Sequence, residues 1–402
     1  MMGIVFANGC PRPKQPKPAE PQTGCRDQFN KPVDTFHIYK LPRVSSHPHQ
    51  CIRQGLGFLY LDDNDKKWSL SDVCLDQPSQ AVYYTLQQLY KDLGKREDTL
   101  HALFSDHHGA PAPGKEGRRD SSRAHSKRVY YFDTKQGFAF IHSVPRFPPA
   151  YGYDYPRSGR KNGQSMFCVT LSTETSINEI GQSMYTSQPS LYLASMGAAF
   201  ASALKIDQKG ELALALAKKS VKKSERATKA ARVQRLTTVS GQALYWFDNH
   251  KTWHKVHDTA RLYGDLVQPK LQSSLLVETW LNGRSKDLPS GCRNQTYKVF
   301  NIRQLTIPEA SLDKVKSSVD HSKWAISTTF EKPHVCVGDI NRQDSQTKRG
   351  GGTVCVTDLA VWKAYRKLIK NVEVCDGDED GVDIDTLPFP KVPSAKTRLI
   401  AR

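Results

Sequence analysis

A duplicated tripeptide, His-Ser-Lys, constrains this 402-residue chain more than any other feature of its sequence. It occurs at His125–Lys127 and again at His321–Lys323, and a short apolar run follows each copy. A second apolar run comes next at the same distance, so that Ser143 and Asp339 each lie eighteen residues after their histidine. The repeat predicts two related units, each with a His-x-Lys segment that leads into a strand, a turn and a second strand.

In an extended strand, residues i and i+2 point to the same face, so the histidine and the lysine of each copy can face one ligand. An imidazole can serve as a nucleophile or as an acid, and an ammonium group stabilises negative oxygen. The two units therefore predict two halves of one site for an anionic substrate. The alternative is chance repetition of a polar tripeptide, and the matching downstream register argues against it.

The net charge of +18 and the pI near 9.4 favour an anionic partner. A basic surface concentrates a phosphate-bearing substrate, and counterion release adds salt-dependent affinity. Eight cations crowd one stretch, namely Lys218, Lys219, Lys222, Lys223, Arg226, Lys229, Arg232 and Arg235. We interpret this stretch either as a rim that grips nucleic acid or as the solvated face of a helix. No apolar run approaches the ~20 residues that span a bilayer, so we expect no membrane association.

The length fits two domains or one pseudo-symmetric double domain. Residues 1–24 are rich in proline and predict an extended, disordered leader. We expect a first half over residues 25–207, with the first His-x-Lys, and a second half over 208–402, with the second. Periodicity predicts helices over 79–91, 190–205, 211–231 and 357–370, and strands over 242–247 and 297–302. This alternation is typical of a mixed α/β fold.

Three further patterns resemble metal sites, but we expect none of them to hold a metal. The polar stretch 105–124 reads as a mobile insertion, and its His107 and His108 read as surface residues. His250, His254 and His257 lack a fourth ligand nearby in the sequence. The acidic segment after Cys375 begins like a calcium loop but has Leu387 where such a loop needs glutamate.

The two tripeptides belong to a longer series of motifs that resembles the deoxyribonuclease II family, acid endonucleases similar to the phospholipase D superfamily. The resemblance runs from about Cys25 to Cys375. Its most specific segments are Asp320-His321-Ser322-Lys323-Trp324, Cys336-Val337-Gly338-Asp339-Ile340-Asn341-Arg342 and Arg349-Gly350-Gly351-Gly352-Thr353. Tyr39-Lys40-Leu41-Pro42, His142-Ser143-Val144-Pro145 and Gly163-Gln164-Ser165 add to it.

This resemblance implies a phospholipase D-like, pseudo-symmetric double domain, with two mixed sheets flanked by helices and one active site at their interface. One histidine would attack phosphorus and the other would protonate the leaving oxygen, without a metal or a cofactor. The chain departs from the superfamily pattern, because Asp133 falls one place late after the first copy and Ser327 and Thr328 stand there after the second. The two halves are therefore not equivalent, and the identity of the nucleophile stays open.

The resemblance assigns roles to nine residues. The expected catalytic residues are His125, Lys127, His321, Lys323, His142 and Asn341, and the expected substrate-binding residues are Asp339, Ser143 and Arg342. His142 either orients the nucleophile or binds phosphate, and its alternative is a hydrogen-bonded structural histidine.

Nine cysteines spread along the chain predict an oxidising compartment: secreted, lysosomal or periplasmic. The resemblance suggests pairs of Cys25 with Cys168, Cys292 with Cys375, and Cys336 with Cys355. Cys51 and Cys74 are available for a fourth bridge, and Cys10 is left over.

The resulting hypothesis is a metal-independent acid endonuclease that cleaves double-stranded DNA through a phosphohistidine and leaves 3′-phosphate and 5′-hydroxyl ends. A homodimer is allowed. Two alternatives stay open at this point: a phospholipase D-like hydrolase of another phosphodiester, and an inactive nucleic-acid-binding homologue.

Overall fold

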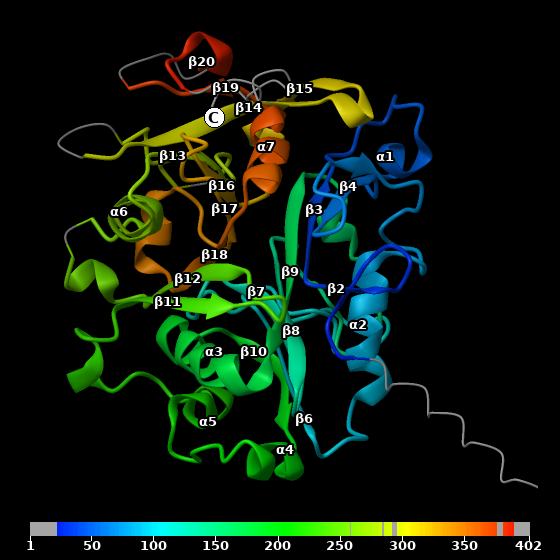
Figure 1. The fold of residues 1–402 in the computed structure, drawn as a ribbon, viewed down its shortest axis with the longest axis vertical. Coiled ribbons are helices and arrows are strands. Elements are labelled where there is room, and N and C mark those ends of the chain that lie inside the picture. The colour runs from blue at the N-terminus through cyan, green and yellow to red at the C-terminus, as the bar shows by residue number, and fades with distance from the viewer. Residues whose placement is uncertain (1–21, 258, 284, 292–295, 376–380, 390–402) are drawn as a thin grey trace, which may run out of the picture.

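A computed structural model describes residues 22–257, 259–283, 285–291, 296–375 and 381–389, and it contains two large β-sheets (Figure 1). The first sheet has eight antiparallel strands. Their order is β10 (Leu191–Met196), β6 (Thr99–Ser105), β7 (Lys127–Asp133), β8 (Gln136–His142), β9 (Gln164–Ser172), β3 (Thr35–Lys40), β4 (Phe58–Asp62) and β5 (Ser69–Leu70). A small ribbon of β1 (Cys25–Arg26) and β2 (Pro32–Val33) precedes it. The expected mixed α/β class with two sheets is confirmed.

The second sheet has ten strands from the C-terminal part of the chain. Their order is β11 (Ala231–Thr237), β12 (Ala243–Asn249), β18 (Gly351–Thr357), β17 (His334–Gly338), β16 (Trp324–Ser327), β13 (Leu275–Glu278), β14 (Val299–Ile307), β19 (Ile369–Val372) and β20 (Val382–Asp383), with β15 (Leu312–Lys316) also on β14. The first sheet ends at Met196 and the second begins at Ala231, so the expected boundary at 207/208 lies in the segment that connects them.

The same local topology surrounds each His-Ser-Lys copy. After the first copy, β7, β8 and β9 form an antiparallel meander, with β6 on its outer side. After the second, β16, β17 and β18 form another, with β13 on its outer side. The predicted unit of His-x-Lys, strand, turn and strand is therefore present twice.

The sheets share one apolar core, which runs across both halves of the chain. Alternating residues of β8 and β9 divide between two clusters, because successive side chains of a strand point to opposite faces. Phe138, Phe140 and Cys168 pack toward α2 (Ala81–Asp92), whereas Ile141 and Phe167 face the shared core. The shared core also holds Trp246 and Trp324 of the second sheet, so one apolar cluster joins the two halves.

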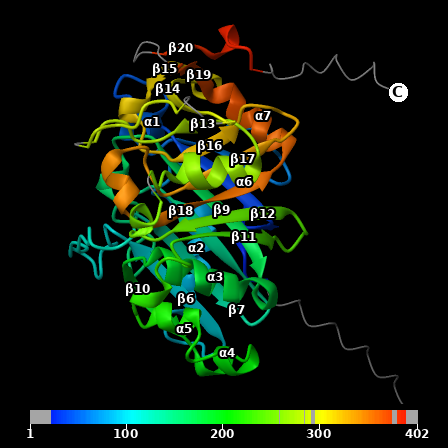
Figure 2. The ribbon, with the colours of Figure 1, turned by 90° about the vertical axis from the view of Figure 1, so that its left-hand side faces the viewer.

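Two helices pack in the shared core between the sheets. Helix α3 (Thr173–Ser187) comes from the first half but lies against β11 and β12 of the second sheet (Figures 1 and 2). Helix α7 (Leu359–Leu368) comes from the second half, and its Tyr365 contacts Trp68 and His37 of the first. Each helix thus bridges the two halves.

The remaining helices are short. They are α1 (Gln50–Gln54), α4 (Ala198–Ala203), α5 (Glu211–Leu216) and α6 (Gln268–Leu271). Three of them, α1, α4 and α5, add buried side chains to the shared core. Within the described residues, no helix is long and apolar enough to cross a bilayer.

Two of the expected helices are confirmed, and a side chain caps the first turn of each. Gln80 accepts hydrogen bonds from Val82 N and Tyr83 N at the start of α2, within the expected range 79–91. Asp358 accepts hydrogen bonds from two backbone amides at the start of α7, within 357–370. The expected strands over 242–247 and 297–302 correspond to β12 and β14.

The other two helix predictions are wrong. Residues 190–205 form strand β10 and then α4, because pairing with β6 overrides helical propensity and Gly197 separates the two elements. The helix expected over 211–231 ends at Leu216, where Lys218 adopts a left-handed conformation at φ 57°. Strand β11 starts at Ala231, so the basic stretch forms a loop with one 3-10 turn and then the start of a strand, instead of a helical face.

Three disulfides join Cys25 to Cys168, Cys51 to Cys74, and Cys336 to Cys355, as expected. Cys375 is also disulfide-bonded. Its expected partner Cys292 lies outside the described residues, as do Cys10, residues 1–21 of the leader and most of the acidic segment after Cys375.

A buried ion cluster ties the two sheets together. Arg128 of β7 is 1% exposed, and its Nη2 lies 2.6 Å from Asp339 Oδ2 in the second half. Its Nη1 lies 3.3 Å from Asp248 Oδ1 on β12, and its guanidinium packs over the ring of Trp246. Burial raises the pKa of Asp248 to about 6, against the opposing charge of Arg128. The arginine thus compensates two buried acids that belong to the other half.

We predict that Arg128→Met lowers the free energy of unfolding by about 3–5 kcal/mol, because it leaves Asp339 and Asp248 buried without a cation. The matched control is Arg96→Met, which breaks the exposed Arg96–Asp98 pair and should cost below about 1 kcal/mol. Urea denaturation at pH 7, followed by circular dichroism, measures both variants. Equal effects of the two substitutions would contradict this role of Arg128.

Candidate active site

The two His-Ser-Lys copies meet at the junction of the halves, and each is held by backbone groups from the opposite half. His125 N donates to Gly350 O at 2.8 Å, and His321 N donates to Gly163 O at 2.9 Å. The backbone amide of each lysine also bonds a side chain of the opposite half. Lys127 N donates to Asp339 Oδ1 at 3.3 Å, and Lys323 N donates to Ser165 Oγ at 3.0 Å. The fold therefore brings both copies of the sequence repeat to one junction between the halves.

The first imidazole is fixed by a backbone carbonyl. His125 Nδ1 lies 2.7 Å from Asp339 O, and because a carbonyl oxygen only accepts, Nδ1 carries the hydrogen. The other nitrogen, Nε2, is then free to receive or deliver a proton, and it lies 3.8 Å from Asp106 Oδ2.

The second imidazole has an amide and a lysine as its polar neighbours. His321 Nδ1 lies 3.1 Å from Gln164 Oε1 and 3.4 Å from Lys323 Nζ. Lys323 Nζ donates to the backbone oxygen of His321 at 2.7 Å, so the lysine stays beside its own histidine. The edge of Trp280 covers the ring of His321, with the ring centres 5.3 Å apart.

Asp106 is a member of the site that the sequence did not reveal. Its Oδ1 lies 2.7 Å from Lys127 Nζ, and its Oδ2 lies 3.3 Å from Arg349 Nη2. It follows directly on β6, whose last residue Ser105 pairs with Lys127, so strand pairing brings the acid to the tripeptide. An acid at the end of an apolar strand was the only signal in the sequence.

The stretch 105–124, expected to be mobile, is bonded into the structure around this acid. Asp120 N donates to Asp106 O at 2.8 Å, and Arg349 Nε donates to Arg123 O at 3.0 Å. The stretch therefore positions a site residue instead of forming an independent insertion.

Burial and neighbouring cations keep both histidines neutral in the free protein. Burial lowers the pKa of His125 well below 6.5, and Lys127 lowers it further. Burial also lowers the pKa of His321 well below 6.5, and the charges of Lys323, Lys127 and His125 lower it further. Asp106 acts in the opposite direction on both imidazoles.

The charges around the histidines are also perturbed. Burial would raise the pKa of Asp106, but Lys127, His125 and His107 bring it well below its usual range, so it is a carboxylate. Burial lowers the pKa of Lys323 well below 10.5, and the charge of Lys127 adds to this effect.

Behind the second tripeptide lies a buried acid cluster. Asp320 Oδ2 accepts a hydrogen bond from Tyr39 OH at 2.8 Å, and Asp320 Oδ1 accepts one from Ser322 N at 2.8 Å. These bonds tie the base of the second tripeptide to β3 of the first half. Burial raises the pKa of both Asp320 and Glu278, and the charge of Asp320 raises that of Glu278 further.

The structure also places the other residues expected at the site. His142 is fully buried between Phe140 and Phe147, and burial followed by the charge of Lys127 lowers its pKa to about 3. Ser143 is buried and donates to Gln164 Oε1 at 2.6 Å, so it braces the amide that contacts His321.

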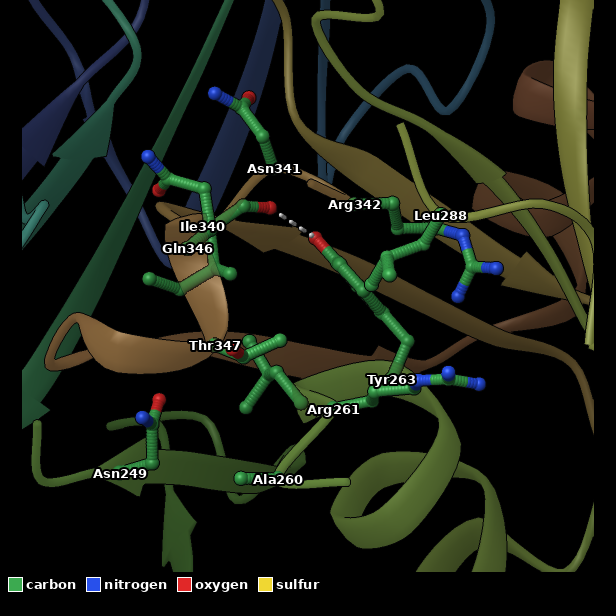
Figure 3. A pocket seen from close by; sticks show the side chains of 11 residues that line it. Asn249, Ala260, Arg261, Tyr263, Leu288, Ile340, Asn341, Arg342, Gln346 and Thr347 are labelled. Carbon is green, nitrogen blue, oxygen red and sulfur yellow. Dashed lines mark hydrogen bonds between the residues drawn. The ribbon is translucent and has the colours of Figure 1, made fainter. Parts of the chain in front are cut away.

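The residues after β17 support the site from behind. Asp339 binds Arg128 through its carboxylate and His125 through its carbonyl oxygen. Arg342 Nε donates to Asn301 Oδ1 at 2.6 Å and Arg342 Nη2 to Pro289 O at 2.6 Å. Asn341 is 5% exposed and borders a pocket with Tyr263 and Arg261, but its amide points away from Tyr263 (Figure 3).

The histidines considered as metal ligands have other partners. His250 Nε2 lies 2.9 Å from Gln188 Oε1, and His108 Nε2 lies 2.8 Å from Ser190 Oγ. Within the described ranges, no three His, Cys, Asp or Glu side chains are grouped closely enough to hold a metal ion.

Comparison with known proteins indicates the same family that the sequence motifs resemble. The family model described as Deoxyribonuclease II matches residues 24–375. Plancitoxin-1 of Acanthaster planci is 32% identical over 353 residues, which cover 87% of this chain and 92% of that protein. Cell-death-related nuclease 7 of Caenorhabditis elegans is 32% identical over 353 residues, covering 87% and 88%.

A human relative is similar to this chain over the same share of its length. Deoxyribonuclease-2-beta of Homo sapiens is 30% identical over 355 residues, which cover 87% of this chain and 91% of that protein. A family match that spans both tripeptides, together with relatives of about 30% identity over most of the chain, identifies the family. The chain belongs to the deoxyribonuclease II family and is a nuclease that hydrolyses DNA.

Proposed function

We propose that this protein is a metal-independent acid endonuclease that cleaves double-stranded DNA through a phosphohistidine and leaves 3′-phosphate and 5′-hydroxyl ends. The observation that carries the proposal is the reciprocal bonding of the two tripeptides, which puts two imidazoles and two lysines at one junction. One imidazole can attack phosphorus while the other protonates the leaving 5′ oxygen. Lys127 and Lys323, together with Arg349, would neutralise the non-bridging oxygens, which is the main catalytic task in phosphoryl transfer.

The exposed cations beside the first half-site would hold the DNA backbone. Arg118 and Arg119 are exposed on the stretch that carries Asp106. Arg123 Nη2 donates to Lys218 O at 3.4 Å, and Lys251 Nζ donates to Ser122 O at 3.2 Å. These bonds connect the stretch to the basic segment after α5 and to the loop after β12, so a basic rim of Arg118, Arg119, Arg123, Lys218 and Lys251 adjoins the site.

Not every cation of the basic segment belongs to this rim. Lys229 Nζ lies 2.6 Å from Glu211 Oε1 and 3.3 Å from Glu225 Oε2, so its charge is compensated. Arg232 Nη1 lies 3.7 Å from Glu211 Oε2. Lys218 and Lys219 are exposed, which favours them as phosphate contacts.

The disulfides support an oxidising compartment, because such bonds persist where thiols are not kept reduced. We infer a secreted, lysosomal or periplasmic location, and an acidic lysosomal lumen would suit the chemistry of the two histidines.

Refolding yields with and without reductant, compared by plasmid nicking, would test whether the protein needs its disulfides.

The first prediction of the mechanism is that plasmid nicking persists in excess EDTA, because the histidines and lysines supply the nucleophile, the acid and the positive charge. A Mg²⁺-dependent nuclease run in the same buffer serves as the control for effective chelation. Loss of nicking that added Mg²⁺ restores would overturn the phosphohistidine scheme.

The second prediction concerns pH. The acid histidine must carry a proton, and its pKa lies below 6.5 in the free protein, so its protonated fraction falls as pH rises through that lowered value. Bound phosphate is an anion and raises this pKa again. Initial rates of nicking in EDTA at constant ionic strength should therefore peak at roughly pH 4.5–6 and fall toward neutrality. A maximum at or above pH 7.5 would be incompatible with a histidine acid.

The third prediction tests the basic rim. The double variant Arg118→Gln/Arg119→Gln should bind a 20-base-pair duplex more weakly, whatever the DNA sequence. A plot of log affinity against log salt concentration should also become less steep, by about 1 for each phosphate that the protein no longer neutralises. Lys314→Gln/Lys316→Gln on β15 removes the same charge from exposed positions and is the matched control. Anisotropy titrations with catalytically inactive protein measure both. An equal loss of affinity in the two variants would show that only net charge matters.

A further inference from the structure

The two half-sites share a local topology but differ at one position. In the first half, Ser105 pairs with Lys127, so the next residue along, Asp106, comes to lie opposite the His-Ser-Lys copy. In the second half, Glu278 pairs with Trp324, and continuing the antiparallel register brings Trp280 opposite the second copy. Asp106 and Trp280 therefore occupy corresponding places, one a carboxylate and the other an indole.

This difference changes the surroundings of the two imidazoles. Asp106 Oδ2 lies 3.8 Å from His125 Nε2, close enough to favour the protonated ring. Trp280 covers His321 with a ring edge and brings no negative charge. Lys323 Nζ lies 3.4 Å from His321 Nδ1, and among the described residues no carboxylate lies within ion-pair distance of His321.

Gln164 completes the asymmetry at the second histidine. Its Oε1 accepts from Ser143 Oγ at 2.6 Å and lies 3.1 Å from His321 Nδ1. Of the two polar neighbours of Nδ1, the amide oxygen is closer than Lys323 Nζ, and when this oxygen accepts the Nδ1 hydrogen, the lone pair of the ring is on Nε2. His321 is also the less buried of the two rings. The second imidazole is thus held neutral, with its nucleophilic nitrogen unengaged among the described residues.

From this asymmetry we propose that His321 is the nucleophile and His125 the general acid, with Asp106 as the positioning residue that keeps His125 in its acid role. This assignment rests on the proposed phosphohistidine chemistry and specifies it further. Asp106 also holds Lys127 and Arg349 in place beside the reacting phosphate.

Atoms and electrons balance in both steps. The lone pair of His321 Nε2 forms the N–P bond, the P–O5′ bond breaks, and O5′ keeps the bonding electrons and takes the proton from His125 Nε2. In the second step water attacks phosphorus and gives a proton to His125 Nε2. The P–N bond breaks, its electrons return to His321 Nε2, and the 3′-phosphate leaves with both histidines in their starting states.

The assignment can be tested with thymidine 3′-(4-nitrophenyl phosphate), because nitrophenolate is a good leaving group that does not need an acid. His125→Asn should lose plasmid nicking by more than about 100-fold, the scale of a general acid. On the nitrophenyl ester it should still release one equivalent of nitrophenolate per chain in a burst. Turnover should then stop, because the second step lacks its base, and an adduct of thymidine phosphate should appear on the peptide that contains His321.

The reverse variant should behave differently. His321→Asn should lose both nicking and the burst, whereas His257→Asn, at a half-exposed histidine outside the site, should keep both. Circular dichroism and the melting temperature establish whether each variant is folded. If an asparagine variant does not fold, the glutamine variant at the same position, His125→Gln or His321→Gln, replaces it. An adduct on His125, or a burst in His321→Asn, would overturn the assignment and reverse the roles.

Asp106→Asn tests the positioning role through the pH profile. The charged groups that act on His125 are Asp106, Lys127, Lys323 and Arg349, and Asp106 is the one that raises its pKa. Loss of that carboxylate should move the alkaline fall of plasmid nicking to lower pH. The burst with the nitrophenyl ester should show no alkaline fall with or without the Asp106 carboxylate, because that step does not need the acid. An unchanged nicking profile would show that Asp106 is merely structural and would overturn this part.

Failure of the underlying function would look different from failure of the assignment. If wild-type nicking requires a divalent metal and no phosphorylated histidine forms with either substrate, the phosphohistidine scheme itself is wrong. If a phosphohistidine forms in the wild type but on His125, the scheme stands and only the assignment of roles is overturned.

Discussion

The buried contact between Arg128 and Asp339 is the interaction on which the rest of the site depends. One aspartate of the second half holds two residues of the first: its carboxylate binds the guanidinium of Arg128, and its carbonyl oxygen fixes the ring of His125. Removing one partner of such a buried pair costs far more than the intact pair contributes, because the remaining charge is left without a counterion. The pair therefore enforces one placement of the two sheets, and that placement sets the orientation of the first imidazole.

The other contacts of the junction follow from this placement. Each tripeptide donates a backbone hydrogen bond into the opposite half, and α3 and α7 each pack against the half that they do not belong to. A phosphodiester held between the two tripeptides would meet groups from both halves at once. Catalysis by positioned groups is sensitive to shifts of about 1 Å, so a shared core of large, buried side chains is a physical requirement of this design and not only a source of stability.

The sequence predicted the parts of the site that are local in the chain. The repeated tripeptides, the strands after them, α2, α7 and the three observed disulfides were all predicted from motifs, periodicity or the family resemblance. Asp106 and Trp280 were not, because each reaches its histidine through pairing with a strand that is distant in the sequence. Residues 190–205 were misread for a related reason, since pairing with β6 decides their conformation.

The asymmetry of the two halves also depends on such long-range pairing. The sequence showed that the tripeptides were alike and that their surroundings departed from the superfamily pattern, but it left open which histidine attacks. The register of β6 with β7 and of β13 with β16 supplies the missing distinction, because it puts an acid beside one ring and an indole beside the other.

The central claim is that the two tripeptides form one phosphate site, and the stoichiometry of a phosphate mimic tests it most directly. Isothermal titration of the intact protein with tungstate at pH 5 should show one anion bound per chain, with binding lost in His125→Asn and equally in His321→Asn. Two anions per chain, with one retained in each single variant, would show two independent half-sites and would contradict the claim.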